Sequence, residues 1–228
     1  MTRRGGPFAA SIGCLIALVS SGIPTAVADS AGDLVPAGKV ESLILSGAEL
    51  GDIVGVTFEW NTTKRKPFKS DDLGKDSACT LLMGPDVETF GRDYTGYRFR
   101  VDRDTAEKPD FIVQQRVATY SDADTAAQTF EKAFNRGVMA KCNGTIVVDK
   151  DDNDSQMRFR MQNISLTSAT WVADQLVNDE PLGYGCANIA GVESNVIFGV
   201  KVCQYGNGGP AAATMAERII SQTSGVRI

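Results

Sequence analysis

The residues with the clearest chemical potential lie in a hairpin-like stretch from Tyr184 to Tyr205. Two apolar-rich runs flank the turn-prone sequence GVESN, so the sequence predicts two antiparallel strands. Their register places Cys186 opposite Cys203 and Asn188 opposite Lys201. We expect one face of this hairpin to pack in the core and the other to present cysteines, polar groups and small residues.

Polar side chains of this hairpin are the first candidates for a binding site. If the protein binds a small ligand, we expect contacts along the polar face and at the turn, by Asn188, Asn195 and Lys201. A second set comprises arginines that alternate with apolar residues in two predicted strands. Guanidinium groups in such a row suit a carboxylate or phosphate ligand. The set consists of Arg98, Arg100, Arg158 and Arg160, of which we retain Arg158 and Arg160 as candidates, with solvated outward positions as the alternative.

Several catalytic chemistries have no support in this composition. The chain contains no histidine, which removes Ser-His-Asp and Cys-His arrangements and the commonest zinc ligand. No GxxxxGK[ST] or GxGxxG motif follows a predicted strand. The sequence 206–210 is glycine-rich and precedes a helix, which can cradle an anion, but we interpret it as a plain loop. No particular carboxylate pair is singled out for hydrolysis. We therefore expect a non-enzymatic protein without a cofactor.

One acidic run resembles the start of a calcium loop. Residues 149–154 read DKDDND, but the glycine required at the sixth position is Asp154. The position of the bidentate glutamate falls on Arg160. We interpret the run as an acidic hairpin turn and expect no metal site.

The amino terminus has the features of a secretory signal peptide. Arg3 and Arg4 precede an apolar run, and Ala26-Val27-Ala28 matches a small-residue cleavage site, so residues 1–28 are predicted to be a signal peptide. A lipoprotein signal ending at Cys14 is the alternative, although it would leave a very short apolar core before the cysteine. Removing the two arginines leaves 21 basic against 28 acidic residues, a net charge of −7. This charge disfavours nucleic acid as a partner.

The mature chain is about 200 residues long, enough for one domain with its own core. Residues 29–38 form a small-residue linker, and residues 39–228 are predicted to be a single domain. No further apolar segment is long enough to span a bilayer. We expect a secreted or extracytoplasmic protein of the cell envelope.

Four cysteines remain after the signal peptide, and an even number in an oxidising compartment indicates two disulfides. Three pairings are possible. The hairpin register favours Cys186–Cys203, which leaves Cys79–Cys142. No pair has the CxxC spacing of a metal knuckle or redox site, so we expect structural disulfides.

Periodicity predicts several strands and helices around this hairpin. Period-two alternation marks strands near 97–101, 111–117 and 157–161, and a further strand is expected at Ala169–Leu176. The run 56–60 also looks like a strand, and 61–77 reads as an exposed loop. A capping box at Ser46 starts a short helix. Ser121 is expected to cap the strongest helix, which runs to Cys142, and Pro210 to begin a final helix. These elements predict an α+β domain of mostly antiparallel strands with helices packed on one face.

The chain also resembles a known family. The similar segments are Ser46-Gly47-Ala48-Glu49-Leu50, Cys79-Thr80-Leu81-Leu82, the helix TAAQTFEKAF before Cys142, and CANIAGVESNVIFGVKVC. In order and spacing they resemble the PknH-like extracellular sensor domain of mycobacteria and their relatives, which also occurs in free-standing exported proteins. The resemblance covers residues 40–224. One departure is Val138-Met139-Ala140-Lys141, where the family often has a tryptophan.

The resemblance implies a fold and a function. The fold would be an antiparallel sheet packed with two or three helices around a cleft, with its first two cysteines paired and its last two paired. The cleft would bind an unidentified small-molecule or envelope ligand. The resemblance therefore implies a sensor-type ligand-binding domain. The alternatives are an envelope protein-interaction or scaffold module, or a carboxylate-dependent hydrolase.

Overall fold

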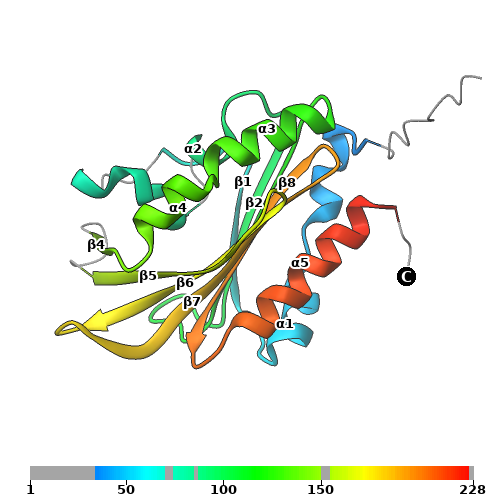
Figure 1. Ribbon diagram of the computed structural model, residues 1–228. Helices are drawn as coiled ribbons and strands as arrows, with labels where there is room; N and C mark the ends of the chain where they lie inside the picture. The colour runs from blue at the N-terminus through cyan, green and yellow to red at the C-terminus, as the bar shows by residue number, and fades with distance from the viewer. Residues whose placement is uncertain (1–33, 70–73, 85–86, 150–154, 226–228) are drawn as a thin grey trace, which may run out of the picture. The chain divides into compact units, whose positions relative to one another are not determined.

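A computed structural model describes residues 34–69, 74–84, 87–149 and 155–225 of the chain (Figure 1). The predicted signal peptide and the acidic run 150–154 lie outside these residues. Among the described residues, no helix has both the length and the apolar character needed to cross a membrane.

The described residues form an eight-stranded antiparallel sheet in the order β1-β2-β3-β8-β7-β6-β5-β4 (Figure 1). The predicted α+β fold class is therefore confirmed. The strands are β1 (Trp60–Lys64), β2 (Gly96–Arg103), β3 (Ile112–Thr119), β4 (Ile146–Asp149), β5 (Ser155–Ile164), β6 (Ser168–Val177), β7 (Glu180–Glu193) and β8 (Val196–Tyr205).

Helical segments lie on both faces of the sheet. One face packs against η2 (Gly74–Leu82), α2 (Val87–Phe90), α3 (Ala123–Ala133) and α4 (Arg136–Cys142). The other face packs against η1 (Ala37–Leu43), α1 (Gly47–Val54) and α5 (Gly209–Thr223). The prediction that helices pack on one face only was therefore incomplete. In the central strands both faces carry buried side chains, so helices cover both sides of the sheet.

The β7–β8 hairpin has the predicted register. Cys186 lies opposite Cys203, and Asn188 lies opposite Lys201. Disulfides join Cys186 to Cys203 and Cys79 to Cys142, which confirms both pairings. The hairpin differs from the expectation in one respect: its cysteine face is not open, because Cys186 and Cys203 belong to the core beneath η2 and α3.

Helix ends follow from local capping, with two small differences from the predictions. The Ser46 capping box at the start of α1 is confirmed. The cap of α3 is Asp122 instead of Ser121. The helix predicted to continue to Cys142 is interrupted at Asn135, because its side-chain oxygen accepts a hydrogen bond from Val138 N at 2.9 Å and starts α4. A new cap requires extended backbone, so one helix becomes two.

The first strand lies further along the chain than expected. The run 56–60 is non-strand except for its last residue, Trp60, where β1 begins. The rest of β1, up to Lys64, lies within the segment 61–77 that was expected to be a loop. All five residues of β1 pair with β2. Pairing with a neighbouring strand therefore outweighs the polar composition of this segment.

Candidate functional site

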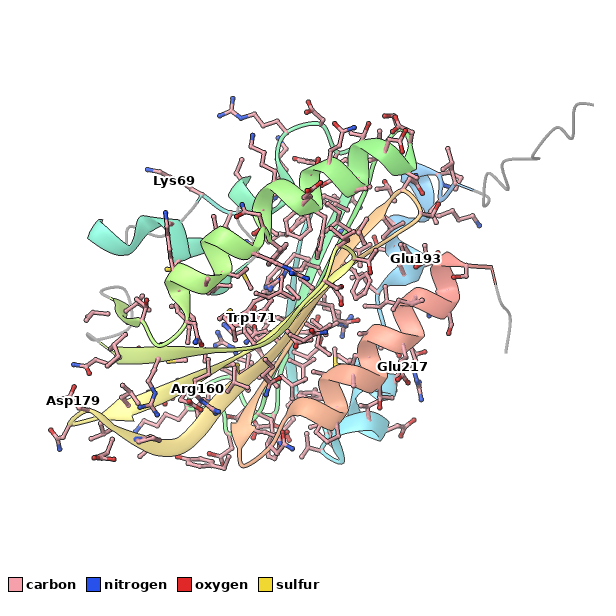
Figure 2. All side chains as sticks on the ribbon, in the orientation of Figure 1. Lys69, Arg160, Trp171, Asp179, Glu193 and Glu217 are labelled. Atoms are coloured by element: carbon pink, nitrogen blue, oxygen red, sulfur yellow. A yellow bond between two sulfur atoms is a disulfide. The ribbon has the colours of Figure 1, made fainter. Side chains whose placement is uncertain are left out.

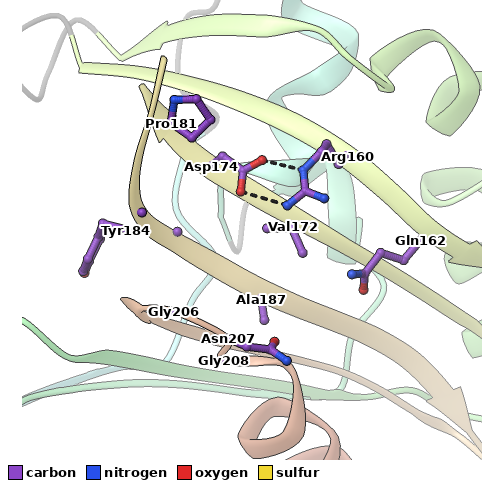
Figure 3. Close-up of a pocket in the computed structure, with 12 residues that line it drawn as sticks. Arg160, Gln162, Val172, Asp174, Pro181, Tyr184, Ala187, Gly206, Asn207 and Gly208 are labelled. Atoms are coloured by element: carbon purple, nitrogen blue, oxygen red, sulfur yellow. Dashed lines mark hydrogen bonds and ion pairs between the residues drawn. The ribbon is translucent and has the colours of Figure 1, made fainter. Parts of the chain in front are cut away.

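The outer strands of the sheet leave a polar pocket beside the start of α5. This helix packs on β7 and β8, while the ribbons of β5, β6 and β7 diverge from it toward their outer end (Figure 1). Side chains from these strands and from the β8–α5 turn enclose a pocket of about 310 Å³ (Figure 3). Its lining comprises Arg160, Gln162, Val172, Asp174, Pro181, Gly183, Tyr184, Gly185, Ala187, Gly206, Asn207 and Gly208.

An ion pair between neighbouring strands forms one wall of the pocket. Arg160 Nε donates to Asp174 Oδ2 at 2.5 Å, and Arg160 Nη2 donates to Asp174 Oδ1 at 3.0 Å (Figure 3). These hydrogen bonds raise the pKa of Arg160 above its ordinary value. The guanidinium therefore remains charged at neutral pH.

A second arginine shares the same carboxylate. Arg158 stands opposite Asp174 in the β5–β6 ladder, and its Nη2 lies 3.9 Å from Asp174 Oδ2. Arg158 Nε is buried without a hydrogen-bond partner in the described part of the chain. Two guanidinium groups thus face one carboxylate, which leaves one excess positive charge in this group of three side chains.

The opposite wall is the turn that starts α5. Asn207 Oδ1 accepts a hydrogen bond from Gly209 N at 2.9 Å, and Gly208 is the N-cap of the helix. Gly208 must be small, because a Cβ there would lie 2.8 Å from Val202 O. The helix N-terminus carries a partial positive charge, which adds to that of the arginines. The strand wall and the turn therefore each contribute positive charge to the pocket, although the chain as a whole is acidic.

Tyr184 adds a neutral group to the rim. Burial, together with the carboxylates of Asp104 and Asp110, raises the pKa of Tyr184 to about 12. Its ring also packs edge-on against Tyr205, with 5.2 Å between the centroids. The phenol therefore stays protonated near neutral pH and can donate a hydrogen bond.

The structure brings Arg158 and Arg160 together but places the other candidates elsewhere. Asn188 and Asn195 are each 1% exposed. The Asn188 amide donates to Cys186 O at 2.8 Å, and Lys201 Nζ donates to Met83 O at 2.9 Å. Both lie on the cysteine face beneath η2, and a ligand contact by these three residues stays a prediction.

Arg98 and Arg100 of β2 lie on the same sheet face as Arg158 and Arg160, but they do not share the pocket. Arg98 is 8% exposed and pairs with Glu41 of η1. Arg100 donates two hydrogen bonds to Asp102, at 2.7 and 2.6 Å. Arg98 and Arg100 therefore each have their own carboxylate, and the four arginines do not form one groove.

Two parts of the pocket were not singled out from sequence. Asp174 had no signal, because its role depends on the pairing of β5 with β6. The start of α5 had a usable signal in the sequence 206–210, where glycines precede a helix. The acidic run 150–154 lies outside the described residues. Within the described part of the chain, no cluster of acidic or cysteine side chains could hold a metal ion.

A search of curated proteins found no match. Among solved structures, the chain is similar to the extracellular domain of PknH from Mycobacterium tuberculosis, with a TM-score of 0.70 and 18% sequence identity. The similarity covers 85% of this chain and 99% of the other, and it shows a shared fold.

The profile of the PknH-like extracellular domain matches residues 35–222, which includes every described strand. The two disulfides agree with an extracytoplasmic location. The chain therefore belongs to the family of PknH-like extracellular domains, which are sensor-type domains.

Proposed function

We propose that this protein is an exported, non-enzymatic ligand-binding domain whose pocket beside α5 takes a small anion. The observation that carries the proposal is the shared carboxylate: among the described residues, Arg158 and Arg160 both pair with Asp174 and with no other acidic side chain. A carboxylate or phosphate ligand would supply the missing negative charge. Arginine suits this role because its planar group can bind two oxygens of such a ligand at once.

The start of α5 supports the same class of ligand. An anion between the strands and this turn would meet the positive end of a helix of 15 residues. The glycines of the turn allow close approach to backbone N–H groups. The pocket is about 310 Å³, which suits a compact group instead of a polymer.

Binding without catalysis fits the groups present at the site. The chain has no histidine, and the four cysteines that follow the predicted signal peptide form disulfides. Hydrolysis by carboxylates would need two of them about 5–10 Å apart. The lining of this pocket contributes one, Asp174, and Arg160 occupies both of its oxygens.

The proposal is tested by titrating the protein with acetate and with inorganic phosphate while backbone and arginine side-chain resonances are followed by NMR. Ionic strength is held constant with chloride. We expect saturable shifts at the Gly208 and Gly209 amides and at Arg160 Nε–H. Arg160→Gln should weaken phosphate binding about fivefold or more, because it removes the excess charge.

A matched control is Arg136→Gln, which makes the same charge change at an exposed position of α4, on the other side of the sheet. It should leave the shifts and the affinity unchanged. Equal weakening by the two variants, or no saturable shift at the pocket with either anion, would overturn the proposal.

A further inference from the structure

Exposed apolar side chains gather at the outer end of the sheet, next to the pocket. Ile146 and Val148 of β4 are 41% and 40% exposed. Val177 and Leu182, at the far end of the β6–β7 hairpin, are 50% and 45% exposed. These four are half of the large exposed hydrophobic side chains in the described part of the chain. Ile146 and Val148 alternate along β4 and so share one face, which gives the edge strand an exposed apolar surface that is covered in some state of the protein.

The strand register shows which of these side chains face the pocket. Val148 pairs with Gln156, which pairs with Leu176, and Leu176 pairs with Pro181. Residues paired in antiparallel strands share a face, so this row lies on the same face as Arg158 and Arg160. Val177 is one residue further along β6 and points to the opposite face.

A second row connects the apolar row to the ion pair. Ile146 pairs with Arg158, and Arg158 pairs with Asp174. The next row holds Arg160, which lines the pocket. Moving outward along β5, the face thus changes from charged at Arg160 to apolar around Gln156. We call the exposed side chains of Ile146, Val148 and Pro181 the apolar strip. Leu176, which lies between them in the sheet, is 4% exposed and forms its floor.

The distance from the arginines to the apolar strip sets the minimum length of such a ligand. Gln156 and Arg160 are four positions apart along β5, which corresponds to about 13 Å of extended strand. A molecule that reaches from the arginines across the strip is therefore longer than the pocket alone. It also needs two chemistries, a negative group at one end and an apolar chain at the other.

We propose that the ligand is an anionic amphiphile, bound as a single molecule with its head at Arg158 and Arg160 and its alkyl chain on the apolar strip. This inference rests on the proposed function, because the head occupies the same pocket. Charge complementarity selects the anionic head, and the continuity of the strip with the pocket selects the attached chain.

The turn of the β6–β7 hairpin argues against a membrane surface as the occupant. Asp179 and Glu180 follow Val177 at the tip, where Figure 2 labels Asp179 at the outer end of the sheet. Two carboxylates there would be repelled by anionic lipid headgroups. A single amphiphile lying along the strip does not have to approach them.

The test compares matched probes on the whole protein by calorimetry, below their micelle concentrations. The head-only probes are acetate and inorganic phosphate, and the head-and-chain probes are decanoate and decyl phosphate. Decyltrimethylammonium carries the same chain with the opposite charge. We expect decanoate to bind about a hundredfold more tightly than acetate, because the chain buries apolar surface on the strip. The two anionic heads then show whether carboxylate or phosphate is preferred.

Variants separate the chain from the head. Val148→Ser and Ile146→Ser should reduce the preference for decanoate over acetate about tenfold and leave acetate binding unchanged. Val177→Ser is the matched control, because Val177 is at least as exposed as Ile146 and Val148 but lies on the opposite face. It should leave both affinities unchanged.

Equal affinities for acetate and decanoate would overturn this inference and leave the proposed function intact. Binding of decyltrimethylammonium as tight as that of decanoate would also overturn it, because the arginines would then not select the head. Binding to phosphatidylglycerol vesicles without binding of monomeric decanoate would show a membrane surface as the occupant and overturn it as well. No binding by any probe would overturn both proposals.

Discussion

The side chain of Asn195 joins the β7–β8 turn to Val35, 160 positions earlier in the chain. Val35 N donates to Asn195 Oδ1 at 2.8 Å, and Asn195 Nδ2 donates to Val35 O at 3.0 Å. The same Nδ2 donates to Tyr120 O at 2.7 Å. One amide group thus holds the start of the described chain, the hairpin turn and the end of β3.

This arrangement predicts a large loss of stability for Asn195→Ala. The substitution leaves buried backbone groups without partners, so the free energy of unfolding should fall by about 3 kcal/mol. Urea unfolding measures this change. Asn163→Ala, at an exposed position of β5, is the control and should change stability little. If both variants unfold at the same urea concentration, the structural role assigned to Asn195 is wrong.

Removal of the carboxylate from the pocket should strengthen anion binding. Asp174→Asn leaves Arg158 and Arg160 without a negative partner, so their attraction for phosphate should rise by about 1 kcal/mol, roughly fivefold in affinity. The gain should shrink at high salt, because screening weakens this attraction. Phosphate titrations at two salt concentrations measure both effects. Unchanged or weaker binding in this variant contradicts an anion site.

The turn before α5 should not tolerate a larger residue. In Gly208→Ala the new Cβ would lie 2.8 Å from Val202 O, so the turn or β8 must shift, and stability should fall by about 1–3 kcal/mol. Gly38→Ala is the matched control, because nothing lies within 4 Å of the corresponding Cβ. Thermal unfolding compares the two. Equal melting temperatures would show that the close approach at Gly208 has no energetic consequence.

Stability at alkaline pH should depend on Tyr184. Its pKa is raised to about 12 in the folded protein, from an unfolded value near 10. The folded state therefore binds the proton more tightly, and its stabilising effect is complete below pH 10 and is lost as pH rises toward 12. Tyr184→Phe should make the loss of stability over this range less steep. Urea unfolding at several pH values measures the slope.

Part of the slope should remain in that variant. Burial also raises the pKa of Tyr120, whose hydroxyl donates to Phe90 O at 2.8 Å. If Tyr184→Phe keeps the full slope, the alkaline sensitivity arises from Tyr120 and other groups, and Tyr184 has no part in it.

Local patterns in the sequence were sufficient for much of the fold. Alternation and turn residues predicted the register that places Cys186 opposite Cys203, because pairing in a hairpin depends on a short loop and a period of two. Capping chemistry predicted the start of α1 at Ser46. These features depend on residues close together in the chain, so the sequence determines them without reference to the rest of the molecule.

Only the tertiary structure decided which polar side chains face a pocket. Asn188 and Lys201 share a face as predicted, but η2 covers that face, and no local pattern shows which helix will cover which side of a sheet. Arg160 becomes part of a site because β6 brings Asp174 beside it and the turn before α5 closes the space opposite. Those contacts join residues 14 or more positions apart, and they form only when the strands pair and α5 packs on β7 and β8.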